Sequence, residues 1–338
     1  MKKPILILTL LVTICSFIIL FYNSNSSKET TINQLAKVSL RLKWLYDPGF
    51  AGELIALKNG IFRNNGLDVD IQPGGFETDP IKLVANGSDT FGVTGADSFL
   101  LARQNGIPIV AFAAGYIHTA VVFYSHKNQN IQSPPDWKGK RIGVQAGQDT
   151  ETIYKVLLSK FNISTNDVKE IPIKYDFSQF LNGQVDIWPG YAAGQSFILN
   201  QKGIPFNTLK PSDFGVNYLG TVYFTTEKTI REQPELVYKF LKSVIEGWNL
   251  AYSNESLAIS YISSFDKTTL TDDLVKWTLE KQRYSIKPAG REYCDFRIED
   301  FQNLQGILKK QNLLTKPVVL DKSVSMEFLD KFYLRKSN

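Results

Sequence analysis

The sequence predicts an α/β protein built of two lobes, and three observations lead to that prediction. Residues 41–71 read as strand, turn, helix and strand, because alternating and helically spaced apolar residues are separated by glycine and proline. Residues 141–188 also begin and end on a strand with helices between. Two runs, 116–124 and 214–226, are rich in β-forming residues and suited to carry the chain between lobes. We therefore expect two mainly parallel sheets joined by two crossovers.

The first lobe is expected to be discontinuous, with residues 38–117 and 222–338. The residues of Tyr46–Gly49 predict a turn, and Ala51–Ile61 carries apolar residues at the spacing of a helix. After the second crossover, amphipathic helices are expected to pack around this lobe, at 233–254, 257–264, 272–284 and 298–311. The strands expected here are Arg41–Trp44, Leu67–Ile71, Phe91–Val93 and Val110–Gly115.

The second lobe is expected to span 118–221. Ser133–Asp136 forms a turn, and a helix over Glu151–Phe161 follows, with Asp149 or Thr150 as its N-cap. A further helix over Tyr191–Lys202 should end at Gly203. The strands expected here are Arg141–Val144 and Val185–Trp188.

The N-terminus predicts a membrane segment. Lys2 and Lys3 precede an uncharged apolar run, Pro4–Tyr22, which approaches the ~20 residues that span a bilayer. No small-residue cleavage site follows it, and Ile14 occupies the position before Cys15 where a lipoprotein signal carries a small residue. We favour an uncleaved signal anchor at residues 1–22, followed by a linker at 23–37; cleavage and lipidation are the alternatives. All three place residues 30–338 on the extracytoplasmic face of the cytoplasmic membrane.

Composition argues against several classes of protein. A net charge of +5 with scattered basic residues does not predict nucleic-acid binding. His118, His126 and Cys294 make no zinc site of recognised spacing, and Cys15 lies inside the apolar run, so the rest of the chain has no partner for an intrachain disulfide. No nucleophile–base pair is visible either. We predict no catalytic residue, no metal and no cofactor.

Four motifs in order resemble the NMT1/THI5-like family. They are Phe50–Gly52 with the glycine-linked segment Lys58–Asp70, then Pro80–Val93, Lys138–Val144 and Leu181–Asp186. The resemblance covers about residues 38–255 and implies a periplasmic-binding-protein type II-like fold, with a ligand cleft between two lobes. It departs from the fungal enzyme branch, which carries a cysteine-rich motif and a His-Thr-Gly segment where this chain has Pro48–Gly52. We therefore do not expect an enzyme.

The expected ligand site lies beyond the carboxyl ends of the strands, where open α/β sheets bind ligands. Aromatic side chains at loop tips can stack on a flat ligand, whereas polar groups orient it. Each of these residues also has a structural interpretation. The aromatic residues could pack in the core, Asp97 could cap a helix, and His118 could make a structural hydrogen bond. The predicted ligand-binding residues are Trp44, Tyr46, Asp47, Phe50, Asp97, Ser98, His118, Gln145, Trp188 and Tyr191.

The resemblance implies the binding component of an ABC importer, a monomer that works with a permease and an ATPase. A planar heterocycle is the expected ligand, with a thiamine-pyrimidine precursor first and a flavin second. A sulfonate such as taurine, or nitrate, is the alternative; Arg41, placed at the start of a strand, and Arg103, on a helix face, are the main basic candidates for it. Two other functions remain open: a pyrimidine-biosynthesis enzyme, and a ligand-sensing domain for a partner receptor.

Overall fold

A computed structural model describes residues 34–75, 77–173, 177–216 and 218–335. The chain divides into two compact units, Met1–Leu35 and Ala36–Asn338, and the second unit carries every helix and strand given below. The predicted anchor at residues 1–22 lies outside the described residues, as does most of the predicted linker. In the described part of the chain, no helix is both long enough and apolar enough to cross a membrane.

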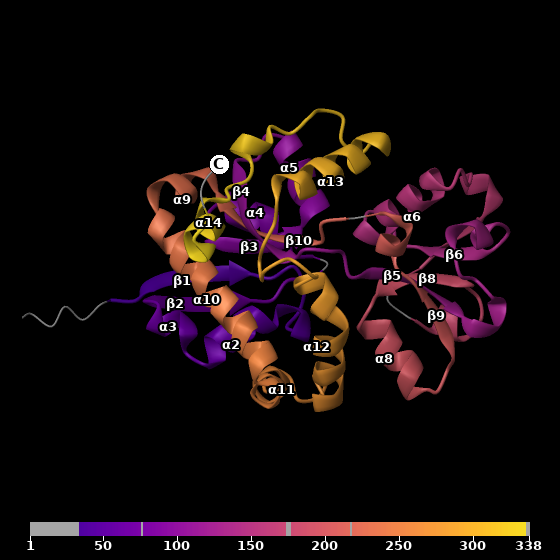
Figure 1. Cartoon of the computed structure of the whole chain (residues 1–338), viewed down its shortest axis with the longest axis horizontal. Coiled ribbons are helices and arrows are strands. Elements are labelled where there is room, and N and C mark those ends of the chain that lie inside the picture. The colour runs from indigo at the N-terminus through magenta and orange to yellow at the C-terminus, as the bar shows by residue number, and fades with distance from the viewer. Residues whose placement is uncertain (1–33, 76, 174–176, 217, 336–338) are drawn as a thin grey trace, which may run out of the picture. The chain divides into compact units, whose positions relative to one another are not determined.

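Two separate five-stranded sheets confirm the predicted two-sheet α/β architecture (Figure 1). The first sheet has the strand order β2-β1-β3-β10-β4, and the second has the order β7-β6-β8-β5-β9. The strands of the first sheet are β1 (Ala36–Arg41), β2 (Leu67–Gln72), β3 (Phe91–Gly95), β4 (Ile109–Tyr116) and β10 (Thr221–Thr226). Those of the second are β5 (Val121–His126), β6 (Arg141–Val144), β7 (Lys169–Pro172), β8 (Ile187–Tyr191) and β9 (Phe206–Leu209).

Each sheet contains one strand that opposes the rest. In the first sheet β10 is antiparallel to both of its neighbours, and in the second sheet β5 is antiparallel to both of its own. These are the two strands that the chain enters directly from the other sheet, by way of residues 117–120 and 210–220. A strand that begins at the edge where the other strands end must run against them. The predicted crossovers therefore account for the one reversed strand in each sheet.

Helices follow the strands of both sheets. Around the first sheet they are α2 (Ala51–Lys58), α3 (Ile61–Asn64), α4 (Pro80–Ala85), α5 (Ala96–Gln104), α9 (Glu227–Glu232), α10 (Pro234–Ser253), α11 (Glu255–Ser263), α12 (Asp272–Ile286), α13 (Ile298–Lys310) and α14 (Glu327–Tyr333). With the second sheet lie α6 (Asp149–Lys160), α7 (Ser178–Leu181) and α8 (Gly194–Gln201). Short 3₁₀ helices are η1 (Pro48–Phe50), η2 (Lys127–Gln129), η3 (Pro134–Trp137), η4 (Thr165–Asp167), η5 (Pro211–Phe214) and η6 (Leu320–Lys322).

Several predicted boundaries were wrong. The first strand ends at Arg41 instead of beginning there, because buried Val38 and Leu40 already alternate with half-buried Ser39 and Arg41. Its start at Ala36 also shortens the predicted linker. Helix α6 begins at Asp149, after Gln148 as N-cap, so Asp149 and Thr150 are helical residues and not caps. Tyr191 closes strand β8 rather than opening a helix.

Two arginine–aspartate pairs explain the aspartates of the motifs Pro80–Val93 and Leu181–Asp186. Asp89, two residues before the start of β3, accepts from Nε of Arg41 at 2.9 Å. Asp186, directly before β8, accepts from the backbone N–H of Arg141 at 2.8 Å and from its guanidinium at 2.5 and 3.0 Å. Each aspartate therefore ties the start of one strand to its parallel neighbour, which is a structural role for both motifs.

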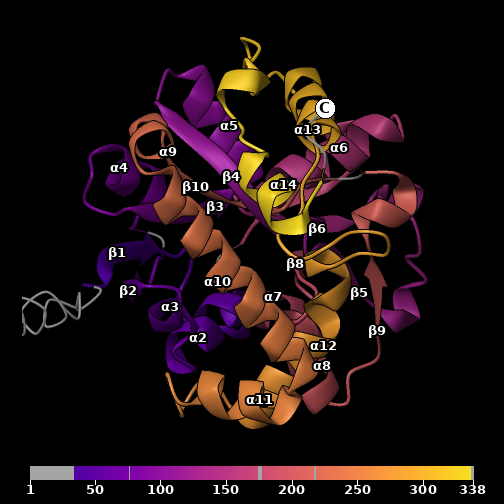
Figure 2. The same cartoon turned by 60° about the vertical axis from the view of Figure 1, so that its left-hand side comes forward.

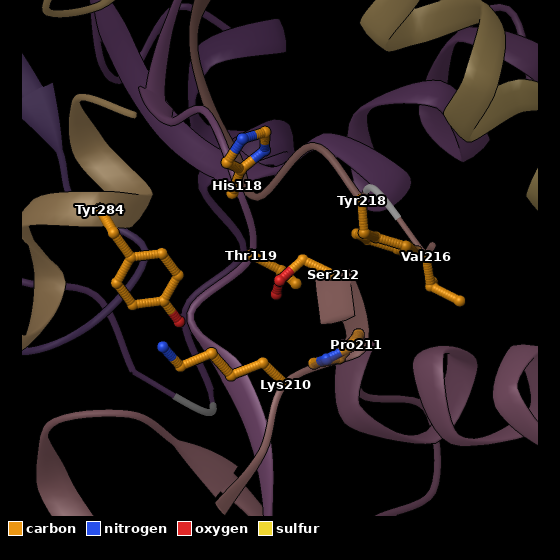
Figure 3. A pocket seen from close by; sticks show the side chains of 8 residues that line it. All are labelled: His118, Thr119, Lys210, Pro211, Ser212, Val216, Tyr218 and Tyr284. Atoms are coloured by element: carbon orange, nitrogen blue, oxygen red, sulfur yellow. The ribbon is translucent and has the colours of Figure 1, made fainter. Parts of the chain in front are cut away.

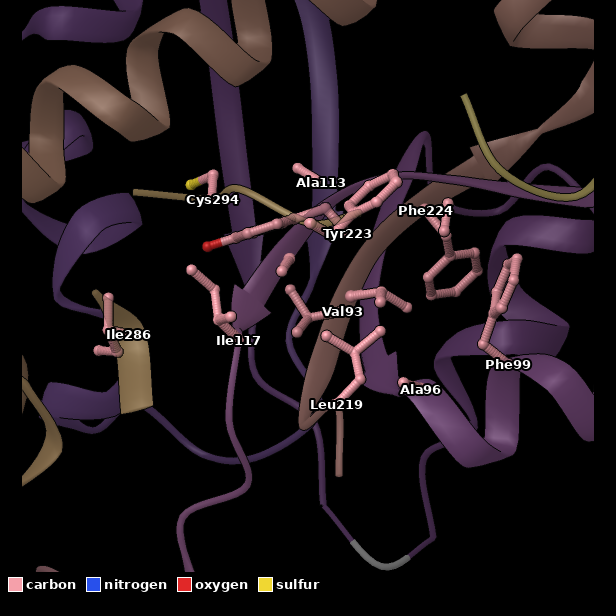
Figure 4. Close-up of a cluster of buried hydrophobic side chains, with 14 of the residues drawn as sticks. Val93, Ala96, Phe99, Ala113, Ile117, Leu219, Tyr223, Phe224, Ile286 and Cys294 are labelled. Atoms are coloured by element: carbon pink, nitrogen blue, oxygen red, sulfur yellow. The ribbon is translucent and has the colours of Figure 1, made fainter. Parts of the chain in front are cut away.

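The core of the first sheet continues toward the crossovers. Val93, Ile117, Leu219 and Tyr223 lie together in Figure 4 and are almost fully buried. Cys294 belongs to the same cluster and is a buried free thiol. Because these side chains come from strands and crossovers alike, the packing that stabilises the sheet also fixes where the chain leaves it.

A close approach of backbones joins α2 to α10, which pack side by side (Figure 2). A Cβ atom on Gly247 would collide with the carbonyl oxygen of Gly52, and a Cβ on Gly52 would collide with the indole of Trp248. Neither position has room for a side chain. The glycine of the Phe50–Gly52 motif is thus required by helix packing.

Candidate functional site

The carboxyl ends of parallel strands from both sheets meet at the crossovers. In the first sheet β1, β3 and β4 run the same way and end at Arg41, Gly95 and Tyr116, where the chain leaves toward the second sheet. In the second sheet β6 and β8 end at Val144 and Tyr191, beside the start of β5. Ligands of open α/β sheets bind at such edges.

An ion pair connects the loop after β1 to the first residue of α6. Nζ of Lys43 lies 3.4 Å from Oδ2 of Asp149, and the side chains are 31% and 11% exposed. The hydroxyl of Tyr191 donates to the other oxygen of Asp149 at 2.9 Å. Burial acts to lower the pKa of Lys43, but the charges of Asp149 and Asp97 outweigh it, so this pKa is raised. Lys43 is therefore a cation that faces carboxylates from both sheets.

Asp97 is buried in the first turn of α5. Its Oδ1 accepts from the backbone N–H of Ser98 at 2.7 Å, and its Oδ2 accepts from the hydroxyl of Tyr218, in the second crossover, at 2.9 Å. Burial and then the charge of Asp149 raise the pKa of Asp97, although Lys43 opposes them. Gly95, not Asp97, is the N-cap residue, and Ser98 is exposed. Asp97 thus faces the other sheet with its charge only partly offset.

The loop over residues 44–50 is held by the first sheet and by α12. The hydroxyl of Tyr46 donates to the carbonyl of Ile71 at 2.7 Å, which ties this side chain to β2. Asp47 caps η1 through Gly49, and burial raises its pKa to about 6. Phe50 is buried in the core. Trp44 is half-buried against that core.

Gln282 of α12 joins this loop to the first crossover. Its Nε2 donates to the carbonyl of Pro48 at 2.8 Å, and its Oε1 accepts from the hydroxyl of Tyr116 at 2.7 Å. Farther along α12, Nε1 of Trp277 donates to the hydroxyl of Ser196 on α8 at 3.0 Å. Helix α12 therefore contacts the loop after β1, the crossover and the second sheet's own helix.

A small cavity lies beside the crossovers (Figure 3). Lys210 points toward Tyr284, with Nζ 4.7 Å from the ring centroid, and His118, Thr119, Ser212 and Tyr218 line the remainder together with Pro211 and Val216. Burial, followed by the charge of Arg291, lowers the pKa of His118. The cavity volume of about 10 Å³ accommodates about one water molecule, so a ring-sized ligand needs the facing side chains to separate.

The remaining predicted residues lie apart from this group or at its margin. Trp188 is inside β8, 2% exposed, and packs edge-on against Phe177 in the core of the second sheet. Gln145 directly follows β6 and is half-buried. Of the predicted residues, the structure brings Asp97, His118 and Tyr191 to the facing edges, around Lys43, Asp149 and Tyr218.

Three of the residues at these edges were missed as site residues by sequence reasoning. Lys43 stands beside Trp44, which was selected, and Asp149 was considered only as a cap. Tyr218 lies in the predicted second crossover, so its position could have indicated the site. In the described ranges, His, Cys, Asp and Glu side chains form no group of three or more that could hold a metal ion.

Comparison with known proteins places the chain in a family. A model of the family described as NMT1/THI5 like matches residues 47–258, more than half of the chain. The chain belongs to the NMT1/THI5-like family. It is 24% identical over 312 residues to the riboflavin-binding protein RibY of Chloroflexus aurantiacus, covering 87% of this chain and 86% of that protein.

One further relative and one solved structure complete the comparison. This NMT1/THI5-like chain is 23% identical over 301 residues to the formylaminopyrimidine-binding protein of Halalkalibacterium halodurans, covering 86% of this chain and 90% of the relative. Its fold resembles that of the periplasmic aliphatic sulphonate binding protein SsuA from Escherichia coli, with a TM-score of 0.68, 17% identity and coverage of 86% and 92%. The chain therefore has the periplasmic-binding-protein fold that its sequence predicts.

Proposed function

We propose that this protein is the extracytoplasmic binding component of an ABC importer, and that it binds a small planar heterocycle between the two sheets. The observation that carries the proposal is the pairing of Lys43 with Asp149 across the facing strand ends. Two lobes joined by two crossovers can open and close around a ligand without any chemical step. The names of the two binding-protein relatives given above support the same class of function.

The proposed ligand is a pyrimidine of the thiamine-precursor type or a flavin. Sulfonate and nitrate sites need dense anion donors, and both arginines near the relevant motifs are already engaged. Arg41 pairs with Asp89 and donates to the carbonyl of Pro73, whereas Arg103 pairs with Glu227 and donates to Ser323. Neither guanidinium is left to bind an anion at the facing edges. We propose that the protein acts as a monomer with a permease and an ATPase.

Two other functions make different predictions. A pyrimidine-biosynthesis enzyme would show turnover, and a sensing domain would co-purify with a signalling partner. A gene neighbourhood that encodes a permease and an ATPase would favour transport over both. The absence of that neighbourhood together with measured turnover would contradict the importer proposal.

Calorimetry on the full-length chain in mild detergent tests the ligand class. We expect a pyrimidine or riboflavin to bind, and pentanesulfonate and nitrate not to bind. Tight sulfonate binding without heterocycle binding would overturn the proposed ligand.

Replacing Trp44 with alanine should weaken binding of that heterocycle about tenfold, because an aromatic contact contributes on the order of 1 kcal/mol beyond the area it buries. Tyr238→Ala is the matched control, since Tyr238 is half-buried on α10 beside Lys331. It should leave affinity unchanged. Thermal melting of both variants checks that the fold is retained, and equal affinity of Trp44→Ala and wild type would remove Trp44 from the site.

A further inference from the structure

The charges at the facing edges do not balance. Asp97, at the start of α5, and Asp149, at the start of α6, both interact with the charge of Lys43. Among the described residues Lys43 forms an ion pair with Asp149 alone, so the charge of Asp97 is only partly compensated. Among the described residues, the other polar contacts of the two carboxylates come from neutral groups, namely the hydroxyls of Tyr191, Tyr218 and Ser98 and backbone N–H groups. One cation thus serves two carboxylates.

One polar group in the first turn of α6 is left without a hydrogen-bond partner among the described residues. The hydroxyl of Thr150, next in the chain after Asp149, is buried and has no hydrogen-bond partner within the part of the chain that is described. Buried polar groups are normally satisfied, so this hydroxyl is an exception in the first turn of α6.

At each of these two helix starts, one backbone N–H group is already engaged by a carboxylate of the chain itself. Asp97 accepts from the N–H of Ser98, and Asp149 accepts from the N–H of Thr150 at 2.9 Å. Helix N-termini ordinarily attract negative ligands, but here the chain's own carboxylates occupy two of these donors. A sulfonate or nitrate would have to approach two carboxylates.

We propose that Lys43 determines the charge of the ligand that this protein accepts. In the unliganded protein its ammonium occupies the position beside Asp149, and on binding an N–H-donating edge of the ligand takes that position. This inference rests on the proposed function. The lysine acts as an internal competitor: it compensates Asp149 in the unliganded protein and must move aside for the ligand. An amidine-like or amino-substituted ring edge replaces it, whereas an anionic group does not.

The inference predicts opposite effects for the two partners of the ion pair. Lys43→Met removes the competitor and should strengthen binding of an amino-substituted ring about tenfold. Asp149→Asn removes the acceptor charge and should weaken that binding at least tenfold. Lys43→Arg keeps the charge and should retain the wild-type preference. Lys155→Met is the matched control, because Lys155 pairs with Glu151 elsewhere on α6, and it should have no effect.

The probes are 4-amino-2-methylpyrimidine and 4-methoxy-2-methylpyrimidine, which share a ring but differ in the N–H donor, together with riboflavin and pentanesulfonate. Affinities are measured by calorimetry on the full-length chain in mild detergent, and thermal melting confirms that each variant is folded. We expect the amino compound to bind more tightly than the methoxy compound in wild type, and Lys43→Met to enlarge that difference.

The outcomes separate this inference from the proposed function. If a heterocycle binds but Lys43→Met leaves its affinity unchanged or weakens it, the inference is overturned and the binding function stands. Preference for pentanesulfonate over both pyrimidines and riboflavin would also overturn it. If none of the probes binds to wild type, the proposed function is contradicted and the inference fails with it.

Discussion

Gly247→Ala is expected to lower the free energy of unfolding by about 3 kcal/mol, at the upper end of the usual cost of overpacking a core. The new methyl group would meet the carbonyl oxygen of Gly52 on the neighbouring helix, and backbone cannot move aside as a flexible side chain can. The higher helix propensity of alanine offsets only about 1 kcal/mol. The loss is measured by urea unfolding, followed by circular dichroism of the full-length chain.

Gly306→Ala on α13 is the matched control for this substitution. Gly306 is an exposed helical glycine, and a Cβ atom there would meet nothing within 4 Å. The same chemical change should therefore stabilise the protein by about 0.5–1 kcal/mol. Similar effects of the two substitutions, in either direction, would show that the close approach of α2 and α10 does not limit stability.

Glu53→Gln is expected to flatten the dependence of stability on pH. The carboxyl group of Glu53 is 1% exposed, and its Oε1 accepts from the hydroxyl of Tyr223 at 2.8 Å. Its Oε2 has no hydrogen-bond partner among the described residues. Burial raises the pKa of Glu53 from 4.5 to about 7, and the charge of Asp47 adds to that increase. The folded protein therefore binds a proton here more tightly than the unfolded chain does.

The direction of the pH effect follows from that difference. Stability from Glu53 is fully present below about pH 4.5 and is lost as the pH rises through about 7. The two pKa values correspond to about 3 kcal/mol, and glutamine, which does not titrate, removes this dependence. Asp47, whose pKa is raised to about 6, leaves a smaller dependence of the same sign.

Urea unfolding at pH 5, 6, 7 and 8 measures this contribution. Between pH 5 and 8, wild type should lose about 3 kcal/mol more of its free energy of unfolding than Glu53→Gln does. Glu77→Gln, at an exposed position, should behave as wild type. Parallel stability profiles for wild type and Glu53→Gln would show that the carboxyl group is already accommodated as an ion in the folded core.

Sequence patterns predicted the elements of this fold well because they depend on neighbouring residues. Alternation and turn residues located β2 and β6 to within a residue, and helical periodicity located α10. Tyr191 was missed as a strand residue because Ala192 and Ala193 read as the start of the following helix. Where a boundary depends on which strand lies alongside, the local pattern is not enough.

The site was predicted less completely because its contacts join distant parts of the chain. Lys43 follows a strand of the first sheet, whereas Asp149 begins the helix that follows a strand of the second, and nothing near either residue in the sequence indicates the other. Trp188 was selected for its position near a strand end. Strand β8 is the middle strand of the second sheet, however, and a strand buried on both faces turns a tryptophan into a core residue.

The position of β10 has a consequence for the order in which the protein folds. This strand lies between β3 and β4 in the first sheet, yet it is made only after the whole of the second sheet has left the ribosome. Until residues 221–226 are available, β3 and β4 have a gap between them and the first sheet cannot close. The second sheet, by contrast, is continuous from Val121 to Leu209 and has all its strands early. During synthesis the later-encoded sheet is therefore complete first, whereas β4 stays separate from β1, β2 and β3 until a segment more than a hundred residues away joins them.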